Sequence, residues 1–112
     1  MKEKTTFATF EKLDIRVGII KKVKTFPKAK KPAYKLWVDF GEKIGIKKSS
    51  AQITEKYTKD ELEGKKVIAV INFPPLQIAE FKSEVLVMGI YANGGVVLLS
   101  PDKNTRLGDK IG

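Results

Sequence analysis

The sequence predicts an all-β domain, a five-stranded barrel with one short helix between the third and fourth strands. Three observations predict this class: short runs in which apolar and polar residues alternate, turn residues between those runs, and a single segment with a good helix-start signal. The chain has 112 residues, of which 42% are hydrophobic, so it is long enough for one compact domain and too short for two. We therefore treat residues 1–112 as one domain, with its core over about residues 10–112.

The first strand is long and is expected to bend. Its apolar positions are Ile15, Val17, Ile19 and Val23. Gly18 stands in the middle of this run, where a bend or a bulge would let the strand curl. A strand that curls in this way is what a small barrel needs.

The second strand has the clearest pattern in the chain. After a proline-containing connection over residues 26–32, apolar and polar side chains alternate until Gly41. The apolar face carries Tyr34, Leu36, Val38 and Phe40. The opposite face carries Lys35, Trp37 and Asp39. A third strand is expected over residues 44–50, although Lys47 and Lys48 weaken its alternation.

One helix is predicted. Thr58 followed by Glu61 matches a capping box, and the polar segment 54–62 closes at Gly64, which together indicate a short helix or helical turn. No other segment is a good helix candidate.

The sequence pattern predicts mainly strands in the second half of the chain. Residues 67–71 and 85–91 are expected to be strands, and the Asn-Gly-Gly run at 93–95 is a turn into a last strand at 96–99. Residues 101–112 are rich in turn residues. Three strands, a short helix and two or three more strands suit an OB-fold barrel. The alternatives, an SH3-like barrel or a small open sheet, would not obviously place a helix after the third strand.

Positive charge is concentrated in one block. No acid falls between Asp14 and Asp39, and the net charge is +9, with 22 Lys and Arg against 13 Asp and Glu. The cationic residues of the block are Arg16, Lys21, Lys22, Lys24, Lys28, Lys30, Lys31 and Lys35. Such a surface predicts a nucleic acid, an acidic protein or an anionic membrane surface as partner. The alternative is the Lys-rich surface of a heat-adapted protein, but ion-pair networks need both signs of charge.

The composition argues against catalysis. The chain has no cysteine and no histidine, which removes thiol chemistry, the commonest metal ligand and the commonest general base. It also lacks a glycine-rich phosphate loop and a nucleophile elbow. The acids Asp14, Asp39, Glu80 and Glu84 are isolated and read as surface or turn residues. We expect no enzymatic activity, no cofactor and no metal.

No targeting segment is recognisable. Residues 1–10 lack the apolar stretch of a signal peptide, and no window approaches the roughly 18 consecutive apolar residues of a membrane span. We expect a soluble, cytoplasmic protein without membrane insertion.

Lysines and an aromatic ring form a candidate oligonucleotide site, because OB-folds combine a positive groove with rings that stack on bases. Trp37, or else Tyr34, is the candidate ring, and the alternative is that Trp37 packs against a neighbouring loop or a dimer partner. Asn72 and Ser83 could hydrogen-bond a ligand or cap their own turn. The predicted nucleic-acid-binding residues are Lys28, Lys30, Lys31, Lys35, Trp37, Asn72 and Ser83.

An apolar loop over residues 72–81 needs a separate explanation. It contains two prolines, which cannot sit in a central strand. The loop closes the barrel end as core, is buried in a homodimer, or forms a groove for apolar peptide segments. A homodimer would also supplement the modest core of so small a domain. The candidate peptide-binding residues are Phe73, Pro74, Pro75, Leu76, Ile78 and Phe81.

Four segments carry a family signature over nearly the whole chain. They are residues 10–18 (FEKLDIRVG), 26–41 (FPKAKKPAYKLWVDFG), 45–54 (GIKKSSAQIT) and 72–89 (NFPPLQIAEFKSEVLVMG). Together they resemble the tRNA-binding domain family and, within it, the CsaA-type export-related chaperones. The resemblance implies an OB-fold homodimer whose terminal segments help form the interface. It also implies a cytoplasmic chaperone that aids protein export.

The chain departs from the broader tRNA-binding pattern at two places. Where a lysine usually follows an Asn-Leu pair, residues 72–75 read Asn-Phe-Pro-Pro, and where Ser-Glu-Gly-Met is usual, residues 83–86 read Ser-Glu-Val-Leu. A cation and a close-approach glycine are therefore missing, and the loop is more apolar. This favours a chaperone that holds unfolded or pre-export polypeptides. The alternatives are a tRNA-binding module that acts as a general tRNA or aminoacylation cofactor, and a simple dimerisation domain.

Overall fold

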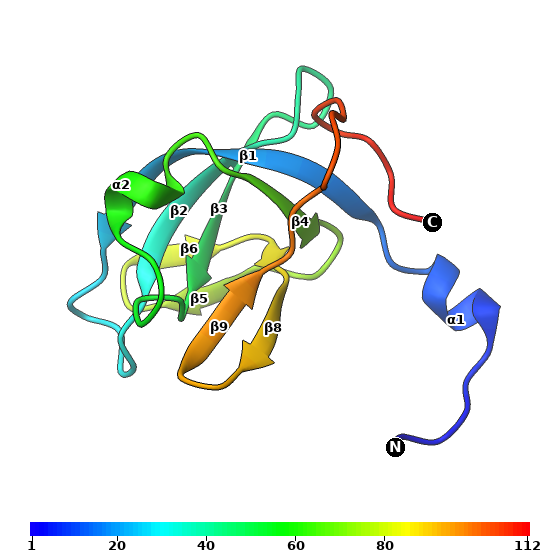
Figure 1. Ribbon diagram of the computed structural model, residues 1–112, viewed down its shortest axis with the longest axis horizontal. Coiled ribbons are helices and arrows are strands. Elements are labelled where there is room, and N and C mark those ends of the chain that lie inside the picture. Colours follow the sequence, from blue (N-terminus) through cyan, green and yellow to red (C-terminus); the bar gives the residue numbers. More distant parts are fainter.

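The computed structural model describes residues 1–112, and its body is an antiparallel sheet curled into a nearly closed barrel (Figure 1). The sheet has the order β3-β2-β1-β4-β7. Its strands are β1 (Ile15–Thr25), β2 (Tyr34–Asp39), β3 (Ile46–Ala51), β4 (Lys66–Val70) and β7 (Leu86–Val87). The prediction of an all-β OB-fold is confirmed.

The barrel closes between β3 and the segment that leads into β7. The backbone N–H groups of Glu84 and Val85 both donate to the Lys48 carbonyl, at 2.7 and 3.2 Å. We call this line of contact between β3 and residues 83–85 the seam of the barrel. Side chains also contribute to it: the Lys48 N–H donates to Glu84 Oε1 at 3.0 Å, and the Ser50 N–H donates to Ser83 Oγ at 2.9 Å. Because these groups occupy the outer N–H groups of β3, the strand is not left as an open edge.

The core lies inside the barrel, under the predicted apolar face of β2. Leu36, Val38 and Phe40 are buried there together with residues from β1, β3, β4 and α2. Tyr34 lies at the border of this core, and its hydroxyl donates to the Tyr57 carbonyl at 2.8 Å. The alternation read from the sequence therefore separates buried from outward side chains correctly.

β1 carries its bulge beyond Gly18, the position at which a bend or a bulge was expected. The strand pairs with both β2 and β4, and its register against β2 shifts between Ile20 and Lys22, which places a bulge at Lys21. Gly18 has another role. A Cβ atom at Gly18 would lie 2.6 Å from Val38 Cγ1 and 2.8 Å from Phe40 Cε1, so only glycine allows the opposite strand to pack this closely.

The predicted helix is present and shorter than expected. α2 (Lys59–Leu62) follows the capping box, in which the Glu61 N–H donates to Thr58 Oγ1 and the Thr58 N–H donates to Glu61 Oε1. Leu62 is fully buried and anchors it. A second helix, α1 (Phe7–Glu11), was not predicted. None of its residues is buried, and it extends away from the barrel (Figure 1).

Two hairpins complete the fold. The predicted strand at 85–91 divides, because β8 (Gly89–Ala92) leaves the barrel and pairs with β9 (Gly95–Leu98). The apolar loop contains the other hairpin, β5 (Leu76–Ile78) and β6 (Phe81–Ser83), which was not predicted. No helix in the structure has the length and apolar character needed to cross a membrane.

Candidate binding groove

A small apolar cluster lies on the outer side of β2 and holds two loops against the barrel. We call its buried members, Phe26, Ala33 and Phe81, the outer cluster. The ring of Phe81 packs edge-on against Phe26 and Trp37, with centroids 5.5 and 5.6 Å apart. Because Phe26 and Ala33 flank the connection between β1 and β2, this packing fixes both that connection and the β5–β6 hairpin.

Between these two segments lies a cavity of about 590 Å³, which we call the basic groove. Lys28, Lys30 and Lys31 line it from the β1–β2 connection, and Leu76 and Ile78 line it from β5. Ser50 and Gln52, at the end of β3, also line it. The groove thus brings together three of the predicted nucleic-acid-binding residues and two of the predicted peptide-binding residues.

Lys35 forms an ion pair and lies beside two aromatic rings. Its Nζ lies 2.9 Å from Glu80 Oε1 and 4.8 and 5.5 Å from the ring centroids of Phe26 and Phe81, and its side chain is 18% exposed. The hydrogen bond from Lys35 and one from the backbone hold the pKa of Glu80 below its usual range. Glu80 is therefore ionised at neutral pH and paired with Lys35.

Trp37 packs against the hairpin. It is half-buried beside Phe81, and Lys22 Nζ lies 4.7 Å from its ring centroid. Lys22 and Lys48 flank Trp37 on the neighbouring strands. This arrangement matches the alternative in which Trp37 packs against a neighbouring loop, and it adds Lys22 and Lys48 to the basic surface around the groove.

Asn72 and Ser83 are both engaged within the protein. The side-chain amide of Asn72 accepts a hydrogen bond from the Asp14 N–H and donates one to the Lys12 carbonyl, each at 2.8 Å. Ser83 holds the edge of β3, as described above. Both residues therefore have structural roles, which the sequence left open.

The remaining predicted peptide-binding residues fall into two groups. Phe73, Pro74 and Pro75 are exposed, but they lie outside the basic groove. Phe81 is only 5% exposed, because it is the centre of the outer cluster. Phe81 thus supports the groove from inside and offers little surface of its own.

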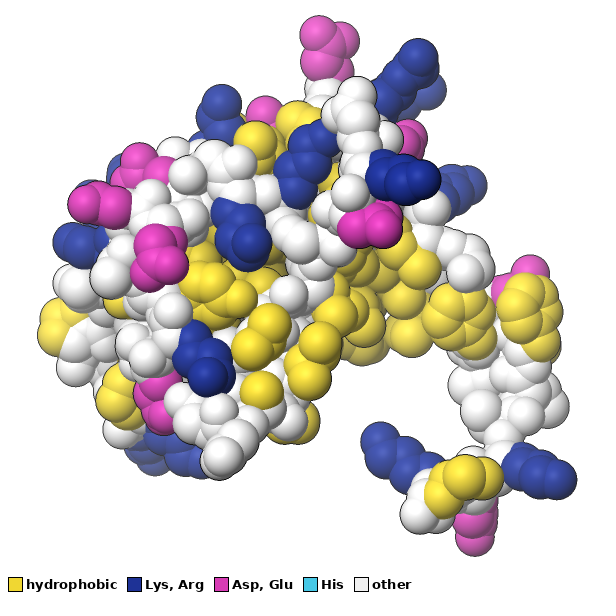
Figure 2. Space-filling model, viewed as in Figure 1, with side chains coloured by type: hydrophobic (Ala, Val, Ile, Leu, Met, Phe, Trp, Pro, Cys, Tyr) yellow, Lys and Arg dark blue, Asp and Glu magenta, His cyan; other side chains and the backbone are white.

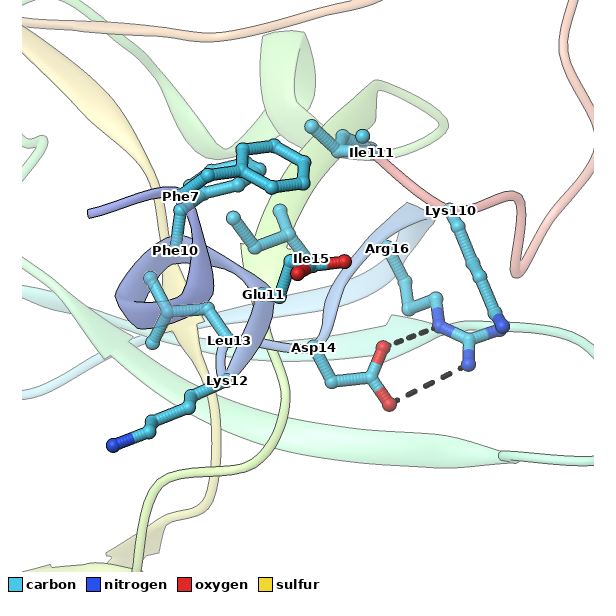
Figure 3. Close-up of a pocket in the computed structure, with 11 residues that line it drawn as sticks. Phe7, Phe10, Glu11, Lys12, Leu13, Asp14, Ile15, Arg16, Lys110 and Ile111 are labelled. Atoms are coloured by element: carbon cyan, nitrogen blue, oxygen red, sulfur yellow. Dashed lines mark hydrogen bonds and ion pairs between the residues drawn. The ribbon is translucent and has the colours of Figure 1, made fainter.

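A second apolar surface lies at the two ends of the chain. Phe7, Phe10 and Ile111 line a cavity of about 410 Å³ together with Ile15 and the Asp14–Arg16 ion pair, and Figure 3 shows these side chains around it. Phe7 is 70% exposed. Figure 2 shows the helix standing apart from the barrel with its apolar side chains uncovered.

The structure contains no group of three or more acids that could hold a metal ion. The groove itself places lysine ammonium groups beside apolar side chains. A barrel of this fold with such a groove belongs to a class of domains that bind oligonucleotides or other extended ligands.

Comparisons with known proteins agree with this class. Residues 15–110 match the family described as "Putative tRNA binding domain". The structure is similar to the CsaA chaperone protein of Picrophilus torridus, at 60% identity and a TM-score of 0.93, covering 97% of this chain and 100% of that one. It is also similar to the chaperone CsaA of Bacillus anthracis, at 44% identity and a TM-score of 0.91, covering 98% and 100%.

A methionine–tRNA ligase of Archaeoglobus fulgidus is 34% identical over 110 residues, which are 98% of this chain but only 16% of the ligase. The chain belongs to the tRNA-binding domain family, and the CsaA chaperones are relatives that it matches over their full length.

Proposed function

We propose that this protein is a non-enzymatic, homodimeric chaperone that holds unfolded or pre-export polypeptides in the cytoplasm. The observation that carries this proposal is the basic groove, where lysines and apolar side chains line one cavity. An extended polypeptide with apolar residues next to acidic ones could use both kinds of side chain at once. Leu76 supports this reading, because it is 63% exposed and has no comparable use in binding phosphates.

The proposal is tested by suppression of aggregation of a chemically denatured client. Wild-type protein at stoichiometric amounts is expected to suppress light scattering, and Leu76→Ser is expected to suppress it less. Ile46→Ser is the matched control, since Ile46 is also exposed but lies at the opposite end of β3 from the groove. Failure of the wild-type protein to suppress aggregation would remove the proposal.

The dimer is supported by the apolar side chains at the chain ends. Phe7, Phe10 and Leu13 are exposed on or beside a helix that buries none of its residues. A second copy would remove this surface from water, as closed homodimers do. Sedimentation is expected to give a dimer for the wild type and a monomer for Phe7→Glu/Phe10→Glu. A monomeric wild type would contradict this part of the proposal.

A second function, tRNA binding, is favoured by the charge of the molecule. The chain carries 22 Lys and Arg residues, yet the structure has only two ion pairs, so most cations are free to bind phosphates. Binding of labelled tRNA should weaken as salt rises. In the variant Lys28→Ala/Lys30→Ala/Lys31→Ala, the slope of log affinity against log salt concentration should become less negative. The change should be about 0.7–0.9 for each phosphate that the variant no longer neutralises. An unchanged slope would exclude the groove as the RNA site.

A further inference from the structure

Glu80 occupies a fixed position at the tip of the β5–β6 hairpin. Ala79 and Glu80 alone connect Ile78 to its strand partner Phe81, and Ala79 has a φ of 51°, as a tight two-residue turn requires. Phe81 is the buried centre of the outer cluster, so the residue next to it cannot move far from the barrel. The sequence position and the packing together determine where the Glu80 backbone lies, and the ion pair with Lys35 directs its carboxylate.

The carboxylate pairs with Lys35 next to two aromatic rings. The rings of Phe26 and Phe81 lie beside Lys35 Nζ, and Glu80 Oε1 completes its surroundings at 2.9 Å. With an exposed fraction of 18%, the Lys35 side chain has little free surface left. A phosphate could approach Lys35 closely only after displacing Glu80.

The lysines of the groove wall differ from Lys35 in this respect. Lys28, Lys30 and Lys31 line the cavity, and neither ion pair of the structure involves them. Lys28 nevertheless lies close enough to Glu80 for its charge to favour the ionised carboxylate and so to lower the pKa of Glu80. The negative charge of Glu80 therefore acts on both Lys35 and Lys28.

We infer that Glu80, which directly follows the groove-lining residue Ala79, is a specificity-determining residue beside the basic groove. Its carboxylate occupies Lys35, which also lies outside the lining, and disfavours a phosphate backbone next to Lys28. The inference rests on the proposed function, since it concerns the choice between polypeptide and RNA in the same groove. A polypeptide is affected less than RNA, because its contacts with Leu76 and Ile78 do not depend on charge and because it carries fewer negative charges per unit length. Glu80 thus biases the groove toward polypeptides.

The test is binding of fluorescently labelled tRNA to the full chain at several salt concentrations. Glu80→Gln is expected to raise the affinity about fivefold at low salt, as removal of one charge a few ångströms from the ligand should. The slope of log affinity against log salt concentration should become more negative by about 0.7–0.9, because Lys35 becomes free to neutralise one more phosphate. Glu42→Gln is the matched control, since Glu42 is exposed beyond the opposite end of β2, and it should leave both values unchanged.

A double variant separates the ion pair from net charge. Lys35→Gln/Glu80→Gln should return the tRNA affinity to about the wild-type value, because it removes a neutral pair. Glu80→Gln alone should change suppression of client aggregation by a smaller factor than it changes tRNA affinity. A loss of suppression would overturn the inference, because Glu80 would then serve polypeptide binding.

Failure of the inference and failure of the proposed function have different signatures. If Glu80→Gln behaves like Glu42→Gln while the triple lysine variant loses tRNA, the groove binds RNA but Glu80 does not select against it. If tRNA binding does not respond to the groove lysines either, the groove is not an RNA site and the inference is overturned with it. If the client assay alone fails, the chaperone proposal is lost and the effect of Glu80 on RNA stands.

Discussion

The two faces of β2 support apolar clusters of very different size. Inward, Leu36 and Val38 belong to a core of thirteen buried residues that the barrel encloses. Outward, Trp37 packs on the outer cluster, which has three buried residues covered only by a hairpin and a loop. The difference shows that a single alternating strand can serve two purposes. Its inward side chains build the core of the fold, and its outward side chains support the candidate site.

If the two clusters are independent, a destabilising substitution in one should affect a different measured property from a substitution in the other. Loss of packing in the core should lower the stability of the whole barrel. Loss of packing in the outer cluster should loosen the walls of the basic groove while the barrel remains folded. Phe40 and Phe81 give a matched pair for this comparison, since both are buried phenylalanines, one in each cluster.

The largest effect is expected for Phe40→Ala. Phe40 is 1% exposed, and its removal leaves a cavity that the closed barrel can fill only in part. The free energy of unfolding should fall by about 3–5 kcal/mol, measured by urea denaturation. A decrease below about 1 kcal/mol would mean that the barrel interior relaxes freely, contrary to the comparison.

Phe81→Ala is expected to cost less, about 2–3 kcal/mol, because the outer cluster is small and open enough to collapse. Far-UV circular dichroism should keep its barrel signature, while Trp37 fluorescence should shift toward the emission of an exposed indole. Binding of tRNA and of client should both weaken. If the barrel unfolds as in Phe40→Ala, the two clusters form one cooperative unit and the comparison is broken.

The smallest effect is expected at the seam of the barrel. Ser83→Ala leaves the Ser50 N–H without its side-chain acceptor and should lower the free energy of unfolding by about 1 kcal/mol. Hydrogen exchange should speed up at the Ser50 amide. The Lys48 amide, held by Glu84, is the internal control and should exchange as in the wild type. Equal acceleration at both amides would show that the seam opens as a whole.

Much of the barrel could be predicted because the sequence patterns that indicate its elements lie within the elements themselves. The alternation in β2 places each side chain on the inner or outer face, and the Thr58–Glu61 capping box defines the start of α2. The bulge at Lys21 could not be predicted, because it arises from the fit of β1 to two neighbouring strands and needs no special residue type. Gly18 was interpreted as the position of a bend or a bulge; the bulge lies beyond it, and Gly18 allows close packing against Val38.

The two elements that were not predicted lack the usual local signals. The turn at residues 79–80 of the β5–β6 hairpin has no Gly, Asn or Asp, and α1 has no buried face to produce a helical pattern. The lysines of the groove could be predicted as a group, because they are neighbours in the sequence. The pairing of Lys35 with Glu80 could not, because the tertiary packing of Phe81 brings together two residues 45 positions apart.

The amide of Asn72 determines where the amino-terminal segment leaves the barrel. It grips the main chain on both sides of Leu13, and no residue of the helix beyond that point is buried. Asn72 anchors the chain immediately before β1 begins, and the helix lies on the far side of that anchor. An anchor directly after the helix limits how far the helix can lie from the barrel. The apolar rings of Phe7 and Phe10 are therefore presented at a defined radius from the barrel.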